Sequence, residues 1–243
     1  MPRMLSVMAL DAGRNHTYDL QVINGAPLRW NWDHHADGPA NGGSDSWVEL
    51  STGHYDTVIM TEALPLDNHI QWSSPEIYGG NFFNLAVRSN SNAQVYMYET
   101  WHGIDDPTWR ARLVNDLPKW ERIVDQINAA NPVGRRMLLV PAGQAMGLLV
   151  DRMESGRVPG LTSRTQVFQS DGIHPNDIGN YFVACVQYAT IYRRSPVGLM
   201  NRTTNPWGGP YQTPSPETAR ALQEIAWEVV STYPRSRVSV LGQ

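Results

Sequence analysis

The sequence predicts an α/β fold with a mostly parallel sheet and helices on both of its faces. Short runs rich in β-branched and aromatic residues alternate along the chain with longer amphipathic segments, which is the pattern of strand-helix-strand units. Residues 55–61 (YDTVIMT) are almost continuously apolar, as expected of a strand buried on both faces. With 243 residues, no composition shift and no internal repeat, we expect a single domain over 1–243.

The first elements follow from local signals. Residues 2–15 predict a helix, because Pro2 suits a first helical position and Met4, Leu5 and Met8 form an apolar stripe. A strand is expected at 18–24 (YDLQVIN), where Gly25 would end it. A long loop with short helical pieces should cover 26–54, ahead of the strand at 55–61.

The middle of the chain continues the alternation. Residues 62–78 predict a loop and residues 81–89 a helix, followed by a strand at 94–100 (QVYMYET). Apolar residues at helical spacing then predict a long helix over 108–130, with a kink at Pro118.

The last part of the chain adds one strand and three helices. We expect the strand at 136–140 (RMLLV) and the helices at 142–154, 177–193 and 216–230. The segment 195–214, rich in Pro, Gly and Asn, predicts a loop.

Charge and cysteine content exclude several classes of protein. A formal net charge of −4 without a clustered basic face argues against nucleic-acid binding. The single cysteine, Cys185, excludes an internal disulfide framework and is expected to be a buried, inert thiol. No apolar run is long enough to span a membrane. Met1-Pro2-Arg3 opens no signal peptide, and the sequence leaves the compartment open: a soluble protein that is cytoplasmic, or secreted if a leader precedes it.

The sharpest chemical motif is the run from Asp171 to Asn176 (DGIHPN), just before the predicted helix 177–193. An aspartate three residues before a histidine on a tight turn can hold its carboxylate against the imidazole, leaving His174 to act as a general base. Pro175 and Asn176 are also ordinary helix-start residues, so a simple capping turn is the alternative interpretation.

The stretch DGIHPNDIGNYFVACVQYATIY resembles the last conserved block of the SGNH (GDSL-type) hydrolase family, in which D-x-x-H supplies the catalytic Asp and His. The resemblance implies a flavodoxin-like, doubly wound, three-layer α/β/α fold. It also implies esterase, lipase or carbohydrate deacetylase activity, with no metal and no cofactor. Asp171 and His174 would be the catalytic pair.

Two further blocks of the family can be compared with this chain. Residues 22–28 (VINGAPL) resemble the second block, which implies that the backbone N–H of Gly25 is an oxyanion donor. The third block, usually G-x-N-D, should follow the strand 55–61, but the chain reads Thr-Glu-Ala-Leu-Pro at 61–65 and lacks the Asn. Asn68 or Asn81 could replace it only if the loop folds back.

The first block of the family, a strand ending in G-D-S with the nucleophilic Ser, has no counterpart before the helix that opens this chain. Three explanations stay open. The sequence is truncated at its start; or residues 237–241 (RVSVL) take the place of the first strand; or the protein is a diverged, non-catalytic relative. Ser44 and Ser46 lie in a Gly-rich loop rather than on the strand-turn-helix elbow that a nucleophile needs.

Four residues at predicted strand ends are candidates for lining a pocket, since ligands of open α/β sheets bind at the carboxyl edge. They are Glu62, Glu99, Trp101 and His102. Residues 33–37 (DHHAD) have metal-ligating side chains, but adjacent histidines point in different directions, and a polar surface loop is the preferred interpretation over a metal site.

The sequence therefore predicts an SGNH-like serine ester hydrolase that acts on acyl or acetyl esters, with carbohydrate esters favoured by the many Trp and Asn residues of the loops. The alternative is a non-catalytic carbohydrate- or small-molecule-binding relative of the same fold. The expected partner is a small-molecule or carbohydrate ester, with no nucleic acid and no membrane. The sequence does not determine the oligomeric state.

Overall fold

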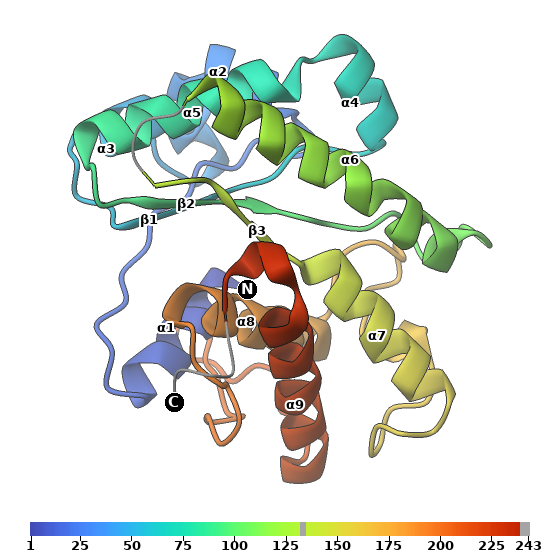
Figure 1. Cartoon of the computed structure of the whole chain (residues 1–243). Helices are drawn as coiled ribbons and strands as arrows, with labels where there is room; N and C mark the ends of the chain where they lie inside the picture. Colours follow the sequence, from blue (N-terminus) through green and yellow to red (C-terminus); the bar gives the residue numbers. More distant parts are fainter. Residues whose placement is uncertain (132–134, 239–243) are drawn as a thin grey trace. The chain divides into compact units, whose positions relative to one another are not determined.

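The computed structural model describes residues 1–131 and 135–238 as an α/β protein with a small parallel sheet of three strands (Figure 1). The described residues divide into two compact units, and each is presented by itself below. One unit comprises residues 19–100 and 114–139 and the other comprises residues 1–18, 101–113 and 140–243 as far as they are described. The prediction of a single domain stays a prediction.

The unit of residues 19–100 and 114–139 contains the sheet, whose order is β1-β2-β3. The strands are β1 (Thr57–Met60), β2 (Gln94–Tyr98) and β3 (Leu138–Val140), the last of which ends at the boundary of the unit. β1 and β2 are parallel, with Thr57 opposite Gln94 and Met60 opposite Met97. Their β-branched, aromatic and sulfur-containing side chains suit a pleated, buried surface.

The helices of this unit are α2, α3, α4, α5 and most of α6. Their bounds are α2 (Leu28–Asp33), α3 (Ser46–Ser51), α4 (Leu66–Trp72), α5 (Pro75–Ser89) and α6 (Trp109–Ala130). Short 3-10 turns at His35–Asp37 and Pro39–Asn41 separate α2 from α3. Figure 1 shows α2, α5 and α6 along the same face of the sheet. Gly79 permits this packing, because a Cβ there would lie 2.8 Å from Ile127 of α6.

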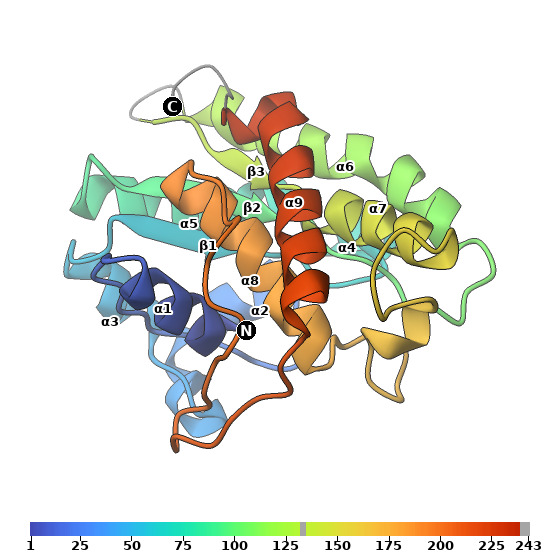
Figure 2. The ribbon, with the colours of Figure 1, turned by 90° about the horizontal axis from the view of Figure 1, so that it is seen from below.

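The other unit is helical and contains α1 (Pro2–Asp11), α7 (Ala142–Glu154), α8 (Asp177–Tyr192) and α9 (Pro216–Thr232), with 3-10 turns at Arg164–Gln166 and Pro234–Ser236. α8 packs against both α1 and α9, and α7 also contacts α9 (Figure 2). α8 is buried on nearly all sides, which matches its run of apolar residues from Tyr181 to Ala189. No helix of the described residues is long and apolar enough to cross a membrane.

The strand predicted at residues 18–24 is wrong. This segment has no strand in the structure, because none of the described strands pairs with it. Its polar groups bond to the neighbouring loops instead: Gln21 Nε2 donates to the Asn31 carbonyl at 2.7 Å, and Gln21 Oε1 accepts from the Ser46 N–H at 3.0 Å. An extended, apolar sequence without a partner strand thus remains irregular.

Most of the other predicted helices and strands are present in the structure. The long loop at 62–78 is wrong in part, since it contains α4 and the beginning of α5. The helix at 142–154 is confirmed, and α6 continues through Pro118. The helix predicted at 81–89 begins earlier, at Pro75, and the helix predicted at 2–15 ends at Asp11. The remaining helices and strands are confirmed with shifts of one or two residues at their ends. Residues 239–241 of the RVSVL segment lie outside the described residues.

Candidate functional site

Asp171 and His174 form a hydrogen-bonded pair on the turn that precedes α8. His174 Nδ1 lies 2.8 Å from Asp171 Oδ2, and Asp171 Oδ1 accepts the backbone N–H groups of Ile173 and His174, both at 3.0 Å. Gly172 adopts φ +71°, a left-handed conformation that favours glycine and lets the chain reverse between the two residues. Backbone N–H groups of the motif itself therefore hold the Asp171 carboxylate beside the His174 ring.

Hydrogen bonds of Asn176 and Gln169 hold this turn at the start of α8. Asn176 caps the helix, because its Oδ1 accepts the N–H groups of Ile178 and Gly179 at 3.0 and 3.1 Å. The backbone of Gln169 donates to the His174 carbonyl at 2.7 Å, which closes the turn on its other side. The capping interpretation of this sequence is thus confirmed, and it coexists with the Asp–His pair.

The electrostatics of the pair suit a general base. The N–H groups of Ile173 and His174, together with the His174 ring, lower the pKa of Asp171 to about 2. An ionised Asp171 only accepts hydrogen bonds, so we assign the proton of the neutral imidazole to Nδ1. Nε2 then carries the lone pair, and the His174 side chain is 70% exposed. This nitrogen can accept a proton from a hydroxyl group.

Trp101 and Ile104 hold the turn from outside the motif. The buried Trp101 donates its Nε1–H to the Ile173 carbonyl at 2.9 Å, and the Ile104 N–H bonds to the Gly172 carbonyl at 2.8 Å. Trp101 was predicted as a pocket residue, but in the structure it packs edge-on against Phe168 and supports the turn. Sequence reasoning missed this role because the contact joins residues 72 positions apart.

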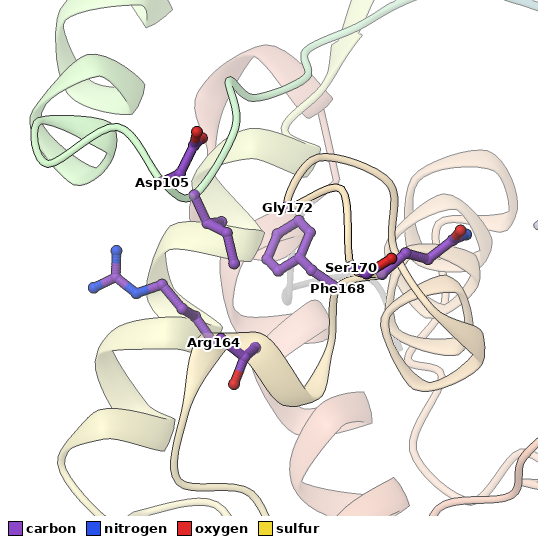
Figure 3. A pocket seen from close by; sticks show the side chains of 8 residues that line it. Asp105, Arg164, Phe168, Ser170 and Gly172 are labelled. Atoms are coloured by element: carbon purple, nitrogen blue, oxygen red, sulfur yellow. The ribbon is translucent and has the colours of Figure 1, made fainter.

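A cavity of about 360 Å³ lies against the same turn (Figure 3). Ser170 and Gly172, which flank Asp171 in the sequence, both line it. The other lining residues are Ile104, Asp105, Arg164, Thr165, Phe168 and Gln169. Of the predicted pocket residues, neither Trp101 nor His102 lines this cavity, and the His102 carbonyl accepts the Trp109 Nε1–H at 2.8 Å.

The remaining predicted site residues, Gly25, Glu62 and Glu99, belong to the unit of residues 19–100 and 114–139. Gly25 is exposed in a turn with φ +71°. Glu99 is buried at the end of β2. Asp171 and His174 belong to the other unit, and the predicted roles of Gly25, Glu62 and Glu99 stay predictions.

Glu62 is a buried carboxyl group at the end of β1. Its side chain accepts the N–H of Ala63 at 2.7 Å and that of Leu28, the first residue of α2, at 3.2 Å. Burial raises the pKa of Glu62 to about 7, although these hydrogen bonds act in the opposite direction. Glu62 thus connects the start of α2 to the strand end, where the resemblance would place the third block.

A second His–Asp pair lies between α2 and α3, and the sequence reading missed it. His35 Nδ1 is 2.7 Å from Asp45 Oδ1, and the His35 ring stacks on Trp47 at 3.9 Å. Asp45 also caps α3, which begins at Ser46. Ser46 is therefore the first residue of a six-residue helix. It does not lie on the strand-turn-helix elbow that a nucleophilic serine needs. Within residues 1–131 and 135–238, no group of three or more His, Cys, Asp or Glu residues could hold a metal ion.

Among the described residues, no serine, threonine or cysteine side chain hydrogen-bonds to the His174 ring. Cys185 is buried inside α8, and burial raises the pKa of its thiol. The start of α1 lies close to the beginning of α8: burial lowers the pKa of the Met1 ammonium group, and the charge of Asp177 opposes that effect. The first turn of α1 is thus near the helix that follows His174.

No family model, no curated protein and no solved structure matches this chain.

Proposed function

We propose that this chain is an SGNH-like serine ester hydrolase acting on acyl or acetyl esters, those of carbohydrates in particular. The observation that carries the proposal is the Asp171–His174 pair, with an ionised carboxylate at Nδ1 and an exposed His174 side chain. We also propose that the fold is the flavodoxin-like three-layer fold of that family and that the Gly25 N–H is an oxyanion donor.

The reaction would proceed in two acyl transfers. His174 Nε2 takes the proton of a serine hydroxyl as the serine oxygen attacks the ester carbonyl. Collapse of the tetrahedral intermediate breaks the ester bond, and His174 returns the proton to the leaving alcohol. His174 then takes a proton from water, whose oxygen attacks the acyl-serine. Collapse of this second tetrahedral intermediate releases the acid, and His174 returns the proton to the serine oxygen. Asp171 keeps the ring oriented and stabilises its protonated form.

The proposal takes the nucleophile to be a serine encoded just upstream of Met1. It is supported by two observations: nothing in the described residues occupies Nε2 of His174, and the start of α1 is near Asp177 at the beginning of α8. A serine at the end of a strand that leads into α1 would match the family's first block.

Hydrolysis of p-nitrophenyl acetate tests this proposal. We expect little or no turnover by residues 1–243, and turnover by a chain extended along the upstream reading frame. In that extended chain, His174→Ala should lower kcat by a factor of about 10² to 10⁴. His35→Ala is the matched control, because it removes another histidine that is paired with an aspartate, and it should leave kcat unchanged.

Two results would contradict the proposal. One is an upstream frame without a strand and serine block. The other is robust hydrolysis by residues 1–243 that His174→Ala abolishes, because another nucleophile would then act in this chain.

A non-catalytic carbohydrate-binding protein is the second candidate, favoured by indoles that are held open to solvent. Trp207 is 89% exposed, and Asn205 Oδ1 fixes its loop by accepting the Trp207 N–H at 3.0 Å. An exposed indole on such a loop suits stacking against a sugar ring. Binding of sugars without turnover by the extended chain, with loss of binding in Trp207→Ala, would favour this candidate over the hydrolase.

A further inference from the structure

The cavity beside the Asp171–His174 turn shares its wall with that turn. Ser170 and Gly172 contribute to the lining, and Asp171 lies between them in the chain. The loop that carries Ile104 and Asp105 is fastened to the same turn by the bond from the Ile104 N–H to the Gly172 carbonyl. A group bound in the cavity would therefore lie next to the turn that carries His174.

Part of the cavity lining is apolar. Ile104 and Phe168 supply it, and Figure 3 shows the Phe168 ring between Arg164 on one side and Ser170 on the other. Two buried indoles hold that ring by edge-on contacts, Trp101 with centroids 5.9 Å apart and Trp109 with centroids 6.3 Å apart. Such a lining suits the apolar face of a ring.

The charges of the cavity wall do not balance. Arg164 is already neutralised, because its Nε and Nη2 donate to the Glu154 carboxylate at 2.7 and 2.9 Å. Asp105 also lines the cavity, is exposed and has no hydrogen bond or ion pair with any described residue, and Figure 3 shows its carboxylate directed away from the Phe168 ring. The unbalanced charge of the wall is therefore negative, which favours ligands that carry hydrogen-bond donors or a positive charge over anionic ligands.

The size and the remaining side chains indicate the kind of ligand. A volume of about 360 Å³ lies at the small end of ligand pockets and suits a single substituted ring. Thr165, Gln169 and Ser170 add neutral groups that can both donate and accept hydrogen bonds.

We infer that this cavity binds the alcohol part of the ester, a hydroxylated ring that is neutral or carries an amino group, and that Asp105 selects against anionic rings. This inference rests on the proposed function. It assigns the cavity lined by Asp105 and Phe168 as the site that selects substrates by their charge.

Binding of three monosaccharide probes tests the inference. Methyl glucoside, glucosamine and glucuronate are neutral, cationic and anionic, and their binding is followed by backbone amide shifts in NMR spectra. We expect the amides of Ile104 and Gly172 to shift with glucosamine and methyl glucoside but not with glucuronate. Asp105→Asn should weaken glucosamine binding about fivefold and leave methyl glucoside binding unchanged.

Matched controls separate the cavity from general surface effects. Thr165→Trp should fill the cavity and abolish binding of both rings, whereas Thr162→Trp, an exposed site outside the lining, should not. Asp11→Asn removes an exposed carboxylate at the end of α1 and should leave glucosamine binding unchanged. A thermal melt of each variant confirms that it is folded.

The inference is overturned if none of the probes shifts these amides, if glucuronate binds as well as glucosamine, or if Thr165→Trp binds normally. These measurements need no nucleophile. Turnover by the extended chain without sugar binding in the cavity would therefore contradict this inference but not the proposed hydrolase activity. Sugar binding in the cavity without turnover would contradict only the proposed hydrolase activity.

Discussion

Trp101 shows that the Asp171–His174 pair depends on a residue outside its motif. Its Nε1–H is the donor for the Ile173 carbonyl, one residue before His174, and its ring is buried against Phe168. Trp109 has a similar position: it is buried, contacts the same phenylalanine edge-on, and donates its Nε1–H to the His102 carbonyl at 2.8 Å. The two indoles thus offer a matched comparison.

Replacing either indole by phenylalanine removes one hydrogen bond and leaves a carbonyl without its donor. We expect Trp101→Phe and Trp109→Phe each to lower the free energy of unfolding by about 1 to 3 kcal/mol. Only Trp101→Phe should also speed hydrogen exchange at the His174 amide, which bonds to Asp171 inside the turn. Equal exchange rates in the two variants would show that Trp101 does not position the pair.

At the scale of elements, the turn packs closely against the start of α8, and Gly179 leaves no room for a side chain there. A Cβ on Gly179 would lie 2.1 Å from the Val167 carbonyl oxygen and 2.9 Å from the Pro175 Cβ. The close approach brings the segment before the motif onto the first turn of α8, where Asn176 makes its cap. Glycine at this position therefore serves packing, since no positive φ requires it.

Alanine substitutions of two helical glycines test this close packing. We expect Gly179→Ala to lower the free energy of unfolding by about 3 kcal/mol, because a backbone carbonyl must move. Gly80→Ala in α5 is the control: a Cβ there would meet only the Asn131 side chain, at 3.5 Å. It should raise the free energy of unfolding by about 0.5 to 1 kcal/mol through the better helix propensity of alanine. Chemical denaturation of both variants measures the difference.

The elements that the sequence predicts well are those with strong local signals. Helix 142–154 has apolar periodicity, and the α8 helix has in addition a cap at Asn176, so both were placed to within a residue or so. The segment 18–24 has the residues of a strand, but pairing is a long-range property that local sequence does not contain. α4 was missed because its seven residues are too few for periodicity to show.

The same distinction applies to the candidate site. The Asp171–His174 pair was predictable because all of its hydrogen bonds lie within four consecutive residues. The His35–Asp45 pair was not, because ten positions separate its members and α2, α3 and two 3-10 turns set its geometry. Asp105 and Arg164 meet at one cavity only through the tertiary fold.

At the scale of the whole molecule, the buried Glu62 should couple folding to pH. Its side chain is 1% exposed, and burial raises its pKa from 4.5 to about 7. A carboxyl group whose pKa is raised in the folded state binds its proton more tightly there than in the unfolded chain. Its contribution to stability is thus fully present below pH 4.5 and is lost as the pH rises through about 7.

Glu62→Gln tests this coupling because the amide has a similar shape and does not titrate. We expect the free energy of unfolding of the wild-type chain to fall by roughly 3 kcal/mol between about pH 5 and 8, and the variant to lose that slope. Glu217→Gln is the control: its own backbone N–H and the Ser215 hydroxyl lower the pKa of Glu217, so its effect belongs to more acid solutions. A persisting slope in Glu62→Gln would assign the pH dependence to other groups.

The compactness of the Asp171–His174 pair has a consequence for the history of such a site. The hydrogen bonds that Asp171 makes to Ile173 and His174 all lie within four neighbouring residues, with the left-handed Gly172 between them. A mutation that removes a distant nucleophile leaves that geometry untouched. An intact base can therefore persist in a lineage after catalysis has been lost, and can serve again as soon as a serine returns within its reach.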